Sequence, residues 1–370
     1  MSLFEASAYA LPHIARLDPY IPGQQLQGPG WVKLNTNENP YPPSPRAVEA
    51  MRDALGKDGS SLARYPDPTS RTLREAIAVH HGLVADQVIV GNGSDDVMTL
   101  LIRTFCGPQD IVGMTVPSYT LYPVLAGIQN TKLVEVLFER SVSLDPKKII
   151  HSGAKLFFLT SPNAPTGVAF EKEAIVEVLE SFPGILVLDE AYAPFAQEDS
   201  VDLLSRFPRL LIVRTFSKAY GLAGLRVGYG LGEASLLHLV DRVRECYNVD
   251  AIAQAGARAA IEDKAYTDAR VQKIIQTRDA FAKTLESWGW FTYPSSANFI
   301  FTEPRTASGE AGSAIARALF DYLLDHKILV RYFDSTPLTC SFLRISIGSR
   351  EAMEVVTQTL QSWKQNVQLK

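Results

Sequence analysis

Three side chains able to hold an aldehyde and a phosphate occur within one short stretch of the chain. Ser217, Lys218 and Arg226 lie there among small residues. Apolar runs that predict buried strands flank the stretch, at 210–213 and 227–231. A serine hydroxyl and an arginine fork can bind phosphate, and a partly neutral lysine can form a Schiff base. We interpret Lys218 as the anchor of an aldehyde cofactor; a solvated turn lysine is the alternative.

A carboxylate ends another apolar run of the sequence. Asp189 follows the run at 185–188, and Tyr192 comes three residues later. A carboxylate at the end of a buried strand is costly to desolvate unless it is paired. A protonated pyridine nitrogen would pair with Asp189 and make the ring an electron sink, and Tyr192 could donate to a ring oxygen. An ordinary ion pair or helix cap, and a packed aromatic ring, remain the alternatives.

Two polar turns add further groups that could hold a cofactor. The segment 91–96 (Gly-Asn-Gly-Ser-Asp-Asp) opens a predicted helix, and its free N–H groups suit a phosphate. It matches neither the dinucleotide fingerprint nor the Walker loop, so it could equally be a capped turn. The segment 161–167 contains two prolines and offers Asn163 as a side-chain donor, although it could be a simple turn.

Strands and helices alternate from residue 87 onward, which predicts an α/β sheet covered on both faces. The candidate strands are 87–90, 111–115, 132–137, 155–160, 185–188, 210–213 and 226–231, with helices at 95–105, 119–128, 172–181 and 201–205. Ligands of such sheets bind beyond the carboxyl ends of the strands. The polar residues that follow each strand should therefore meet at one edge of the sheet.

The rest of the chain predicts an arm and a second domain. Residues 1–30 are rich in proline and predict an extended arm, which we expect to pack with the small domain. Helices are predicted after it at 45–55 and 70–82. The C-terminal third predicts strands at 298–302, 328–332 and 342–346 and helices at 265–288, 311–325 and 350–365. We expect a large domain over 31–255 and a smaller α+β domain over 256–370.

Composition narrows the classes of function. The 370 residues carry a net charge of −4, so nucleic acid and anionic membranes are poor candidate partners. Three widely spaced cysteines, Cys106, Cys246 and Cys340, argue against a disulfide framework or a zinc site and fit a reducing compartment. We see no signal peptide and no apolar run near the roughly 18 residues of a membrane span, so we expect a cytoplasmic protein without a metal.

The motifs together resemble the fold-type I pyridoxal-phosphate aminotransferases of class II. The segments that carry the resemblance are 37–41 (Asn-Glu-Asn-Pro-Tyr), 64–66, 93–95, 117–119, 161–167, 189–192, the Lys218 stretch and 343–348. They cover nearly the whole chain in the family's order. Within that family the sequence is most similar to the histidinol-phosphate aminotransferases. The resemblance implies a large domain with a mostly parallel central sheet, and a smaller α+β domain.

The resemblance also implies a role for each matching residue. Lys218 would be the Schiff-base lysine and the general acid and base, Asp189 would pair with the ring nitrogen, and Tyr192 would bond the ring oxygen. The remaining residues implied to bind pyridoxal 5'-phosphate are Ser94, Asp95, Tyr119, Ser217 and Arg226. Tyr65 would reach the cofactor phosphate of the neighbouring subunit, which implies a homodimer with shared active sites.

The implied substrates are small molecules of histidine biosynthesis. The resemblance implies transfer of an amino group from histidinol phosphate to 2-oxoglutarate, giving imidazole-acetol phosphate and glutamate. The residues it assigns to these substrates are Tyr20, Asn37, Arg331 and Arg344. Two arginines on adjacent predicted strands could serve a phosphate in one half-reaction and carboxylates in the other. Each arginine could also belong to a surface ion pair.

Two departures and several alternatives remain. The family usually has asparagine where this chain has Ala164, so Asn163 could donate to the ring oxygen instead, or Tyr192 could act alone. Asp96 replaces the usual glutamate. An aromatic-amino-acid aminotransferase or a threonine-phosphate decarboxylase could use a similar scaffold. A regulatory module that binds the cofactor without turnover is the alternative from another class, although no basic DNA-binding segment is attached.

Overall fold

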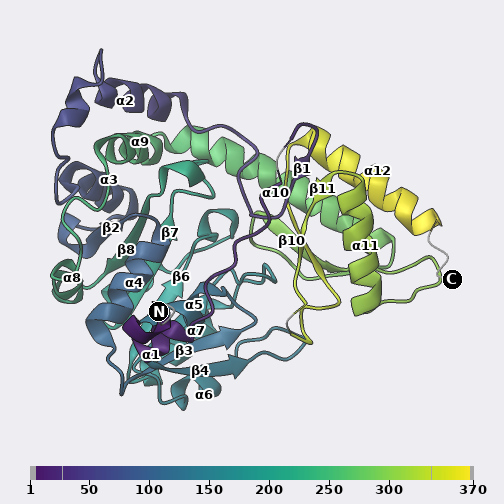
Figure 1. Ribbon diagram of the computed structural model, residues 1–370, viewed down its shortest axis with the longest axis horizontal. Helices are drawn as coiled ribbons and strands as arrows, with labels where there is room; N and C mark the ends of the chain where they lie inside the picture. Colours follow the sequence, from purple (N-terminus) through teal and green to yellow (C-terminus); the bar gives the residue numbers. More distant parts are fainter. Residues whose placement is uncertain (1–5, 27, 335, 367–370) are drawn as a thin grey trace, which may run out of the picture.

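A seven-stranded sheet forms the centre of the larger part of the molecule (Figure 1). The computed structural model describes residues 6–26, 28–334 and 336–366. In spatial order the strands are β2 (Val88–Gly91), β8 (Gly228–Gly232), β7 (Leu210–Thr215), β6 (Ile185–Asp189), β5 (Leu156–Thr160), β3 (Ile111–Val116) and β4 (Lys132–Leu137). Only β8 runs antiparallel to its neighbours. The expected mostly parallel α/β sheet is confirmed.

Helices cover both faces of this sheet, which explains why its central strands are predominantly apolar. One face packs on α4 (Ser94–Phe105), α5 (Leu121–Ile128) and α8 (Ala234–Asp241). The other packs on α3 (Arg71–His81), α7 (Lys172–Ser181) and α9 (Ala251–Glu262), and α2 (Pro45–Leu55) lies on α9. Shorter pieces are α6 (Pro146–Ile150), η2 (Ser60–Ala63), η3 (Ala85–Gln87), η4 (Ala193–Phe195), η5 (Val201–Ser205) and η6 (Ala223–Leu225).

The smaller part is built on a four-stranded antiparallel sheet. Its order is β12 (Arg331–Tyr332), β13 (Leu343–Ser346), β10 (Phe299–Glu303) and β9 (Phe291–Thr292). The 24-residue helix α10 (Lys264–Ser287) runs from the larger part into the smaller one, where α11 (Ser313–Asp325) and α12 (Arg350–Asn366) complete the packing (Figure 1). This arrangement agrees with the expected second α+β unit.

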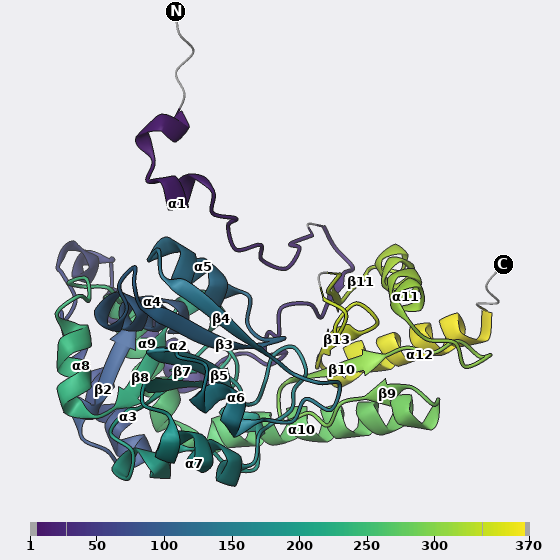
Figure 2. The same cartoon turned by 90° about the horizontal axis from the view of Figure 1, so that it is seen from below.

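The N-terminal arm contacts both parts of the molecule (Figure 2). After η1 (Ala6–Tyr9), helix α1 (Pro12–Ala15) contacts α5 of the larger part. Further on, β1 (Val32–Lys33) pairs in parallel with β11 (Ile328–Leu329) of the smaller part. The arm over residues 1–30 was expected to pack with the small domain. Its Pro22 carbonyl accepts a 3.5 Å hydrogen bond from Arg331 of that part, while its helix α1 lies against the large one.

Element boundaries differ from the sequence-based prediction at two informative places. The predicted strand at 226–231 begins two residues later, because Arg226 has a φ of 54° and cannot continue a strand. The predicted strand at 328–332 is two short strands, β11 and β12, which pair with β1 and β13 in separate sheets. No helix among the described residues is long and apolar enough to cross a membrane.

The central strands predict where the fold is least tolerant of change. Leu159 in β5 is fully buried, whereas Leu137 in the edge strand β4 is 61% exposed. We expect Leu159→Ala to lower the free energy of unfolding by about 2–5 kcal/mol, because it removes buried methyl groups and leaves a cavity. Leu137→Ala, the matched control, should change it by no more than about 0.5 kcal/mol. Urea unfolding measures both, and equal losses would contradict this account of the core.

Candidate active site

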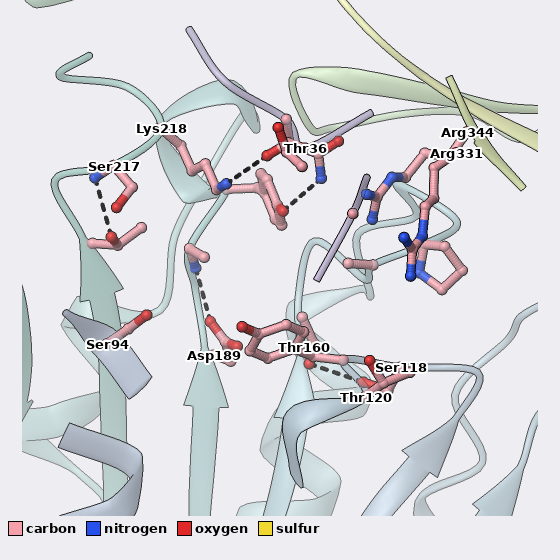
Figure 3. Close-up of a pocket in the computed structure, with 18 of the residues that line it drawn as sticks. Thr36, Ser94, Ser118, Thr120, Thr160, Asp189, Ser217, Lys218, Arg331 and Arg344 are labelled. Carbon is pink, nitrogen blue, oxygen red and sulfur yellow. Dashed lines mark hydrogen bonds between the residues drawn. The ribbon is translucent and has the colours of Figure 1, made fainter. Parts of the chain in front are cut away.

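One cavity of about 190 Å³ opens at the edge of the large sheet where its parallel strands end. Asp189 is the last residue of β6, and Ser217 and Lys218 follow β7. Arg226 precedes β8, but β8 is antiparallel, so its first residues lie at the same edge. Figure 3 shows Asp189, Ser217 and Lys218 around one space, with Arg331 and Arg344 on another side of it, and Arg226 also lines this cavity. The fold thus brings together groups that are far apart in sequence.

The amine of Lys218 points into this cavity, and no carboxylate among the described residues pairs with it. Its Nζ donates a hydrogen bond of 3.1 Å to the carbonyl oxygen of Thr36. Burial lowers the pKa of Lys218 to about 8, and the positive charge of Arg344 acts in the same direction. Near neutral pH the amine can therefore lose a proton far more easily than a surface lysine, as a nucleophile requires.

Asp189 is a buried carboxylate held by neutral groups. Its Oδ2 accepts a 2.6 Å hydrogen bond from the hydroxyl of Tyr122, and its Oδ1 accepts one of 3.1 Å from the backbone N–H of Ala191. Burial raises the pKa of Asp189 to about 6, although these hydrogen bonds oppose the rise. No ion pair between described residues involves Asp189 or Lys218. A cation entering the cavity would satisfy Asp189.

The start of α4 forms an open cradle beside these two groups. Ser94 and Asp95 open the helix and line the cavity with Ser217 and Arg226. A Cβ on Gly228 would lie 2.2 Å from the backbone nitrogen of Ser94, so only glycine leaves room there. Arg226 is held loosely, with Nη1 3.5 Å from Ser217 Oγ and Nη2 3.4 Å from Asp95 Oδ2. Hydroxyl, guanidinium and helix N-terminus together suit a phosphate.

Asn37 fixes the position of Tyr192 across the cavity. The amide of Asn37 donates a 2.8 Å hydrogen bond to the Tyr192 hydroxyl, and its Oδ1 accepts one of 3.0 Å from Ser346 Oγ. Asn298 donates to the backbone oxygen of Asn37. Burial raises the pKa of Tyr192, so the phenol stays protonated and can donate. The structure thus joins the N-terminal segment, the large sheet and the small sheet at this point.

Two tyrosines form an aromatic wall of the cavity. The ring of Tyr20, from the arm, meets the ring of Tyr119 edge to face at 5.8 Å between centroids. Tyr119 also donates a 3.3 Å hydrogen bond to Asp95, and burial raises its pKa. Both residues line the cavity, as expected from the sequence. Their edge-to-face contact leaves a flat ring available to stack on a planar ligand.

Two arginines face the cavity from adjacent strands of the small sheet. Arg331 and Arg344 are direct register partners in β12 and β13. The guanidinium of Arg344 lies 5.3 Å from the ring centre of Phe299 and 5.4 Å from that of Phe333, and Arg331 lies 5.5 Å from Phe333. Burial lowers the pKa of Arg344, and its Nε has no hydrogen-bond acceptor among the described residues. Such donors suit an anionic substrate.

Two expected site residues do not line the cavity. The Asn163 amide donates to the carbonyl oxygen of Pro117 and its Oδ1 accepts from Thr166, while Ala164 lines the cavity in its place. One N–H of the Asn163 amide is thus bound within the turn, and the side chain does not line the cavity. Tyr65 is 81% exposed and stacks on Tyr247, with 4.5 Å between ring centres. It lies outside the cavity of its own chain.

Sequence reasoning missed several residues that complete the site. Tyr122 binds Asp189, and its only signal was its place one helical turn after Tyr119. Thr36 and Asn35 offer backbone oxygens to Lys218 and Arg344, which no side-chain pattern reveals. Phe333 was missed because a lone aromatic residue carries no pattern. Among the described residues, no group of three His, Cys, Asp or Glu side chains could hold a metal ion.

Comparisons with known proteins agree on one family. The family model of aminotransferase classes I and II matches residues 29–360. Histidinol-phosphate aminotransferase of Syntrophotalea carbinolica is 41% identical over 343 residues, 92% of this chain and 95% of the relative. Histidinol-phosphate aminotransferase 1 of Nostoc sp. is 37% identical over 353 residues, 95% of this chain and 97% of the relative.

A solved structure extends this similarity to the fold. The crystal structure of histidinol-phosphate aminotransferase from Sinorhizobium meliloti, in complex with pyridoxal-5'-phosphate, has a TM-score of 0.85 and 26% sequence identity to this chain. The match covers 98% of this chain and 99% of that chain. The similarity therefore spans both parts of the molecule.

The buried amine predicts a measurable loss of stability in the protein without added ligand. Since Lys218 has a pKa near 8 when folded and 10.5 as a model lysine, linkage gives a penalty of about 3 kcal/mol below pH 8. The unfolded chain binds more protons between these values, so the penalty is relieved as pH rises from about 8 to 10.5. We expect Lys218→Met to be more stable than wild type by about 1–3 kcal/mol at pH 7.

Denaturant unfolding at pH 7 and pH 9.5 measures the difference, which should shrink at the higher pH. Lys148→Met replaces a half-exposed lysine and serves as the control, with a change of no more than about 0.5 kcal/mol. A difference between Lys218→Met and wild type that grows with pH would contradict the assigned titration.

Proposed function

Because the chain belongs to the class I and II aminotransferases, we propose that its amino donor is histidinol phosphate and its acceptor 2-oxoglutarate. The products would be imidazole-acetol phosphate and glutamate. One observation carries the choice of substrate. Arg331 and Arg344 face the cavity that contains Lys218 and Asp189, and neither arginine has a carboxylate partner among the described residues. Relatives of 36–41% identity that are named histidinol-phosphate aminotransferases support the same choice.

Pyridoxal phosphate fits the residues that the cavity presents. Asp189 is an unpaired buried carboxylate suited to a protonated ring nitrogen, and Tyr192 is a phenol suited to a ring oxygen. The open backbone at Ser94, together with Ser217 and Arg226, suits the phosphate group. When bound, this cofactor supplies an aldehyde that reacts with amines and a ring that accepts electrons.

With the cofactor bound, Asp189, Lys218 and Tyr119 would each have a separate role in the reaction. Asp189 would hold a proton on the ring nitrogen, since its own neutral partners leave one negative charge to be satisfied. The Nζ of Lys218, with a pKa near 8, could accept a proton from the substrate carbon and return it elsewhere. The aromatic face of Tyr119 would orient the ring and exclude water from one side.

The paired arginines support one site for two kinds of anion. Histidinol phosphate carries a phosphate, and 2-oxoglutarate carries two carboxylates. Arg344 is buried between two rings and would bind an anion at a fixed place, whereas Arg331 lies nearer the arm, 3.5 Å from the Pro22 oxygen. Asn37 and Tyr20, which also line the cavity, would complete the substrate side.

Donor profiling tests the substrate. We expect kcat/KM for L-histidinol phosphate to exceed that for L-phenylalanine by about 100-fold, because phenylalanine offers Arg331 and Arg344 one carboxylate in place of a dianionic phosphate. A preference for phenylalanine would replace the proposal with an aromatic aminotransferase, and release of CO₂ from threonine phosphate would replace it with a decarboxylase. Failure to transfer from any donor, with the cofactor bound, would favour a regulatory binding module.

Lys218→Ala serves as the control for contaminating activity in these assays. We expect it to abolish steady-state transamination, because no other described lysine lines the cavity. Appreciable activity in a pure sample of this variant would contradict the role of Lys218.

We also propose a homodimer with shared active sites. Tyr65 lies outside its own cavity, is 81% exposed and stacks on Tyr247, and both features support a role toward a second copy. Leu62, exposed by 54%, lies close to Tyr65 in sequence and adds apolar surface that a partner could cover. A cytoplasmic location stays a prediction from the cysteine content.

Subunit mixing tests the shared site. We expect Tyr65→Phe to weaken pyridoxal phosphate binding about tenfold or more, since a hydrogen bond to a charged group contributes about 1.5–3 kcal/mol. Hybrids of Tyr65→Phe with Lys218→Ala subunits should recover one normal site, because the Lys218→Ala subunit donates an intact Tyr65. Cofactor titration of the hybrids measures recovery. A monomer by light scattering, or hybrids that recover nothing, would contradict sharing.

A further inference from the structure

A buried ion pair lies directly behind the cavity and takes no part in it. Arg214 Nη2 is 2.6 Å from Glu190 Oε2 and 2.8 Å from Asp199 Oδ2, and its Nε is 3.1 Å from the same Glu190 oxygen. The side chains of Arg214 and Glu190 are 7% and 2% exposed. Burial alone would lower the pKa of Arg214, yet the neighbouring carboxylates raise it. The arginine therefore stays charged and bound.

The strand geometry places this pair back to back with the site. Glu190 follows Asp189, and successive residues of an extended chain point to opposite faces of the sheet. The side chains before them show the same alternation, since Leu188 belongs to the core on one face and Val187 to the core on the other. Arg214 lies in β7, four residues before Lys218. The pair thus joins the two strand ends that carry Asp189 and Lys218.

A third segment is tied to the same glutamate. Glu190 Oε1 accepts a 2.9 Å hydrogen bond from the backbone N–H of Ser200, and the backbone N–H of Glu190 donates to the Val213 oxygen at 2.9 Å. The loop from 190 to 200 contains Tyr192. Both oxygens of one carboxylate therefore hold β7 and this loop at fixed positions relative to β6.

An arginine is well suited to this task and a lysine is not. Its planar fork binds two carboxylates from fixed directions, whereas a lysine ammonium is a single point of charge on a flexible stem. Glu190 likewise needs its full length, because an aspartate would be shorter by one methylene and could not reach both Arg214 and Ser200 in the same backbone position.

We propose that Arg214 and Glu190 are positioning residues that set the separation of Asp189 and Lys218 across the cofactor site. The proposal rests on the proposed function only in that pyridoxal phosphate binds there. Neither residue touches the cavity that the cofactor would occupy, so both act through the strand ends that they join. A site held in this way loses rate when its groups shift by a fraction of an ångström.

Charge-conserving variants separate positioning from simple stability. Arg214→Lys and Glu190→Asp keep the charges balanced and so avoid an uncompensated buried charge. For each variant we expect the Kd for pyridoxal phosphate to rise about tenfold and kcat to fall about tenfold, with the KM for the amino donor within about twofold of wild type. The visible circular dichroism of the bound cofactor, which reports the orientation of its ring, should change in both.

A second buried glutamate provides the matched control. Glu303, 7% exposed and 2.7 Å from Arg140, belongs to the small sheet and touches no site residue. Glu303→Asp should leave the cofactor Kd and the dichroism unchanged. Thermal unfolding of each protein without cofactor checks the fold. If a variant does not fold, the double variant Arg214→Met/Glu190→Leu takes its place with the same expectations. It removes both buried charges and leaves only Asp199, whose side chain is 40% exposed, without its arginine.

Two outcomes are distinguishable by the cofactor titration itself. If wild type does not bind pyridoxal phosphate, the proposed function fails, whatever the variants do. If wild type binds it and the folded variants bind equally well with unchanged dichroism, the positioning role of Arg214 and Glu190 is overturned. A fall in unfolding temperature without either change would likewise overturn it, because the pair would then serve stability alone.

Discussion

The site depends on keeping two buried charges apart and unpaired. Lys218 and Asp189 lie in one cavity, and each would be stabilised if they met as an ion pair. Instead Asp189 bonds to Tyr122 and Ala191, and Lys218 bonds to a backbone oxygen. Burial raises the pKa of Asp189 to about 6 and lowers that of Lys218 to about 8, so each group would gain from a partner of opposite charge. A ligand that carries both a cation and an electrophile would pair with Asp189 and react with Lys218.

The sheet makes this separation possible because neighbouring strand ends lie a fixed distance apart. The parallel strands β6 and β7 deliver a carboxylate and an amine to one edge, and the reversed strand β8 delivers Arg226 there without a crossover helix. The charges needed to hold those ends lie on the opposite face, in Arg214 and Glu190. Asp189 and Lys218 thus lie on the cavity side of the strand ends, and the Arg214–Glu190 pair that holds these ends lies on the opposite face. The two sets of charged groups therefore do not compete for the same hydrogen-bond partners.

Much of this arrangement could be predicted from the sequence, and the gaps have physical causes. The sheet and the rim residues Lys218, Asp189 and Arg226 follow from apolar runs that end in polar groups. Asn163 was expected to bind the cofactor, but its side chain bonds to Pro117 and Thr166 within the turn and does not line the cavity, which the sequence could not show. The hydrogen bond from Lys218 to the backbone oxygen of Thr36 could not be predicted, because every residue has such an oxygen and only the fold determines which one lies near Lys218. The pattern of a single chain also cannot say what the exposed ring of Tyr65 contacts.

The hydrogen bonds of Asn37 have a consequence for the order in which the protein folds during synthesis. Asn37 receives one of its hydrogen bonds from Ser346, 309 residues later in the chain, and another from Asn298. During synthesis the N-terminal segment leaves the ribosome long before either partner exists. The large sheet can form first, but the wall that carries Tyr192 and the neighbouring Arg344 closes only when nearly the whole chain has been made. A chain that ends before residue 298 would therefore contain Ser94 and Lys218 but lack Asn298, Arg344 and Ser346. Its pocket would be open on the side that the small sheet normally closes.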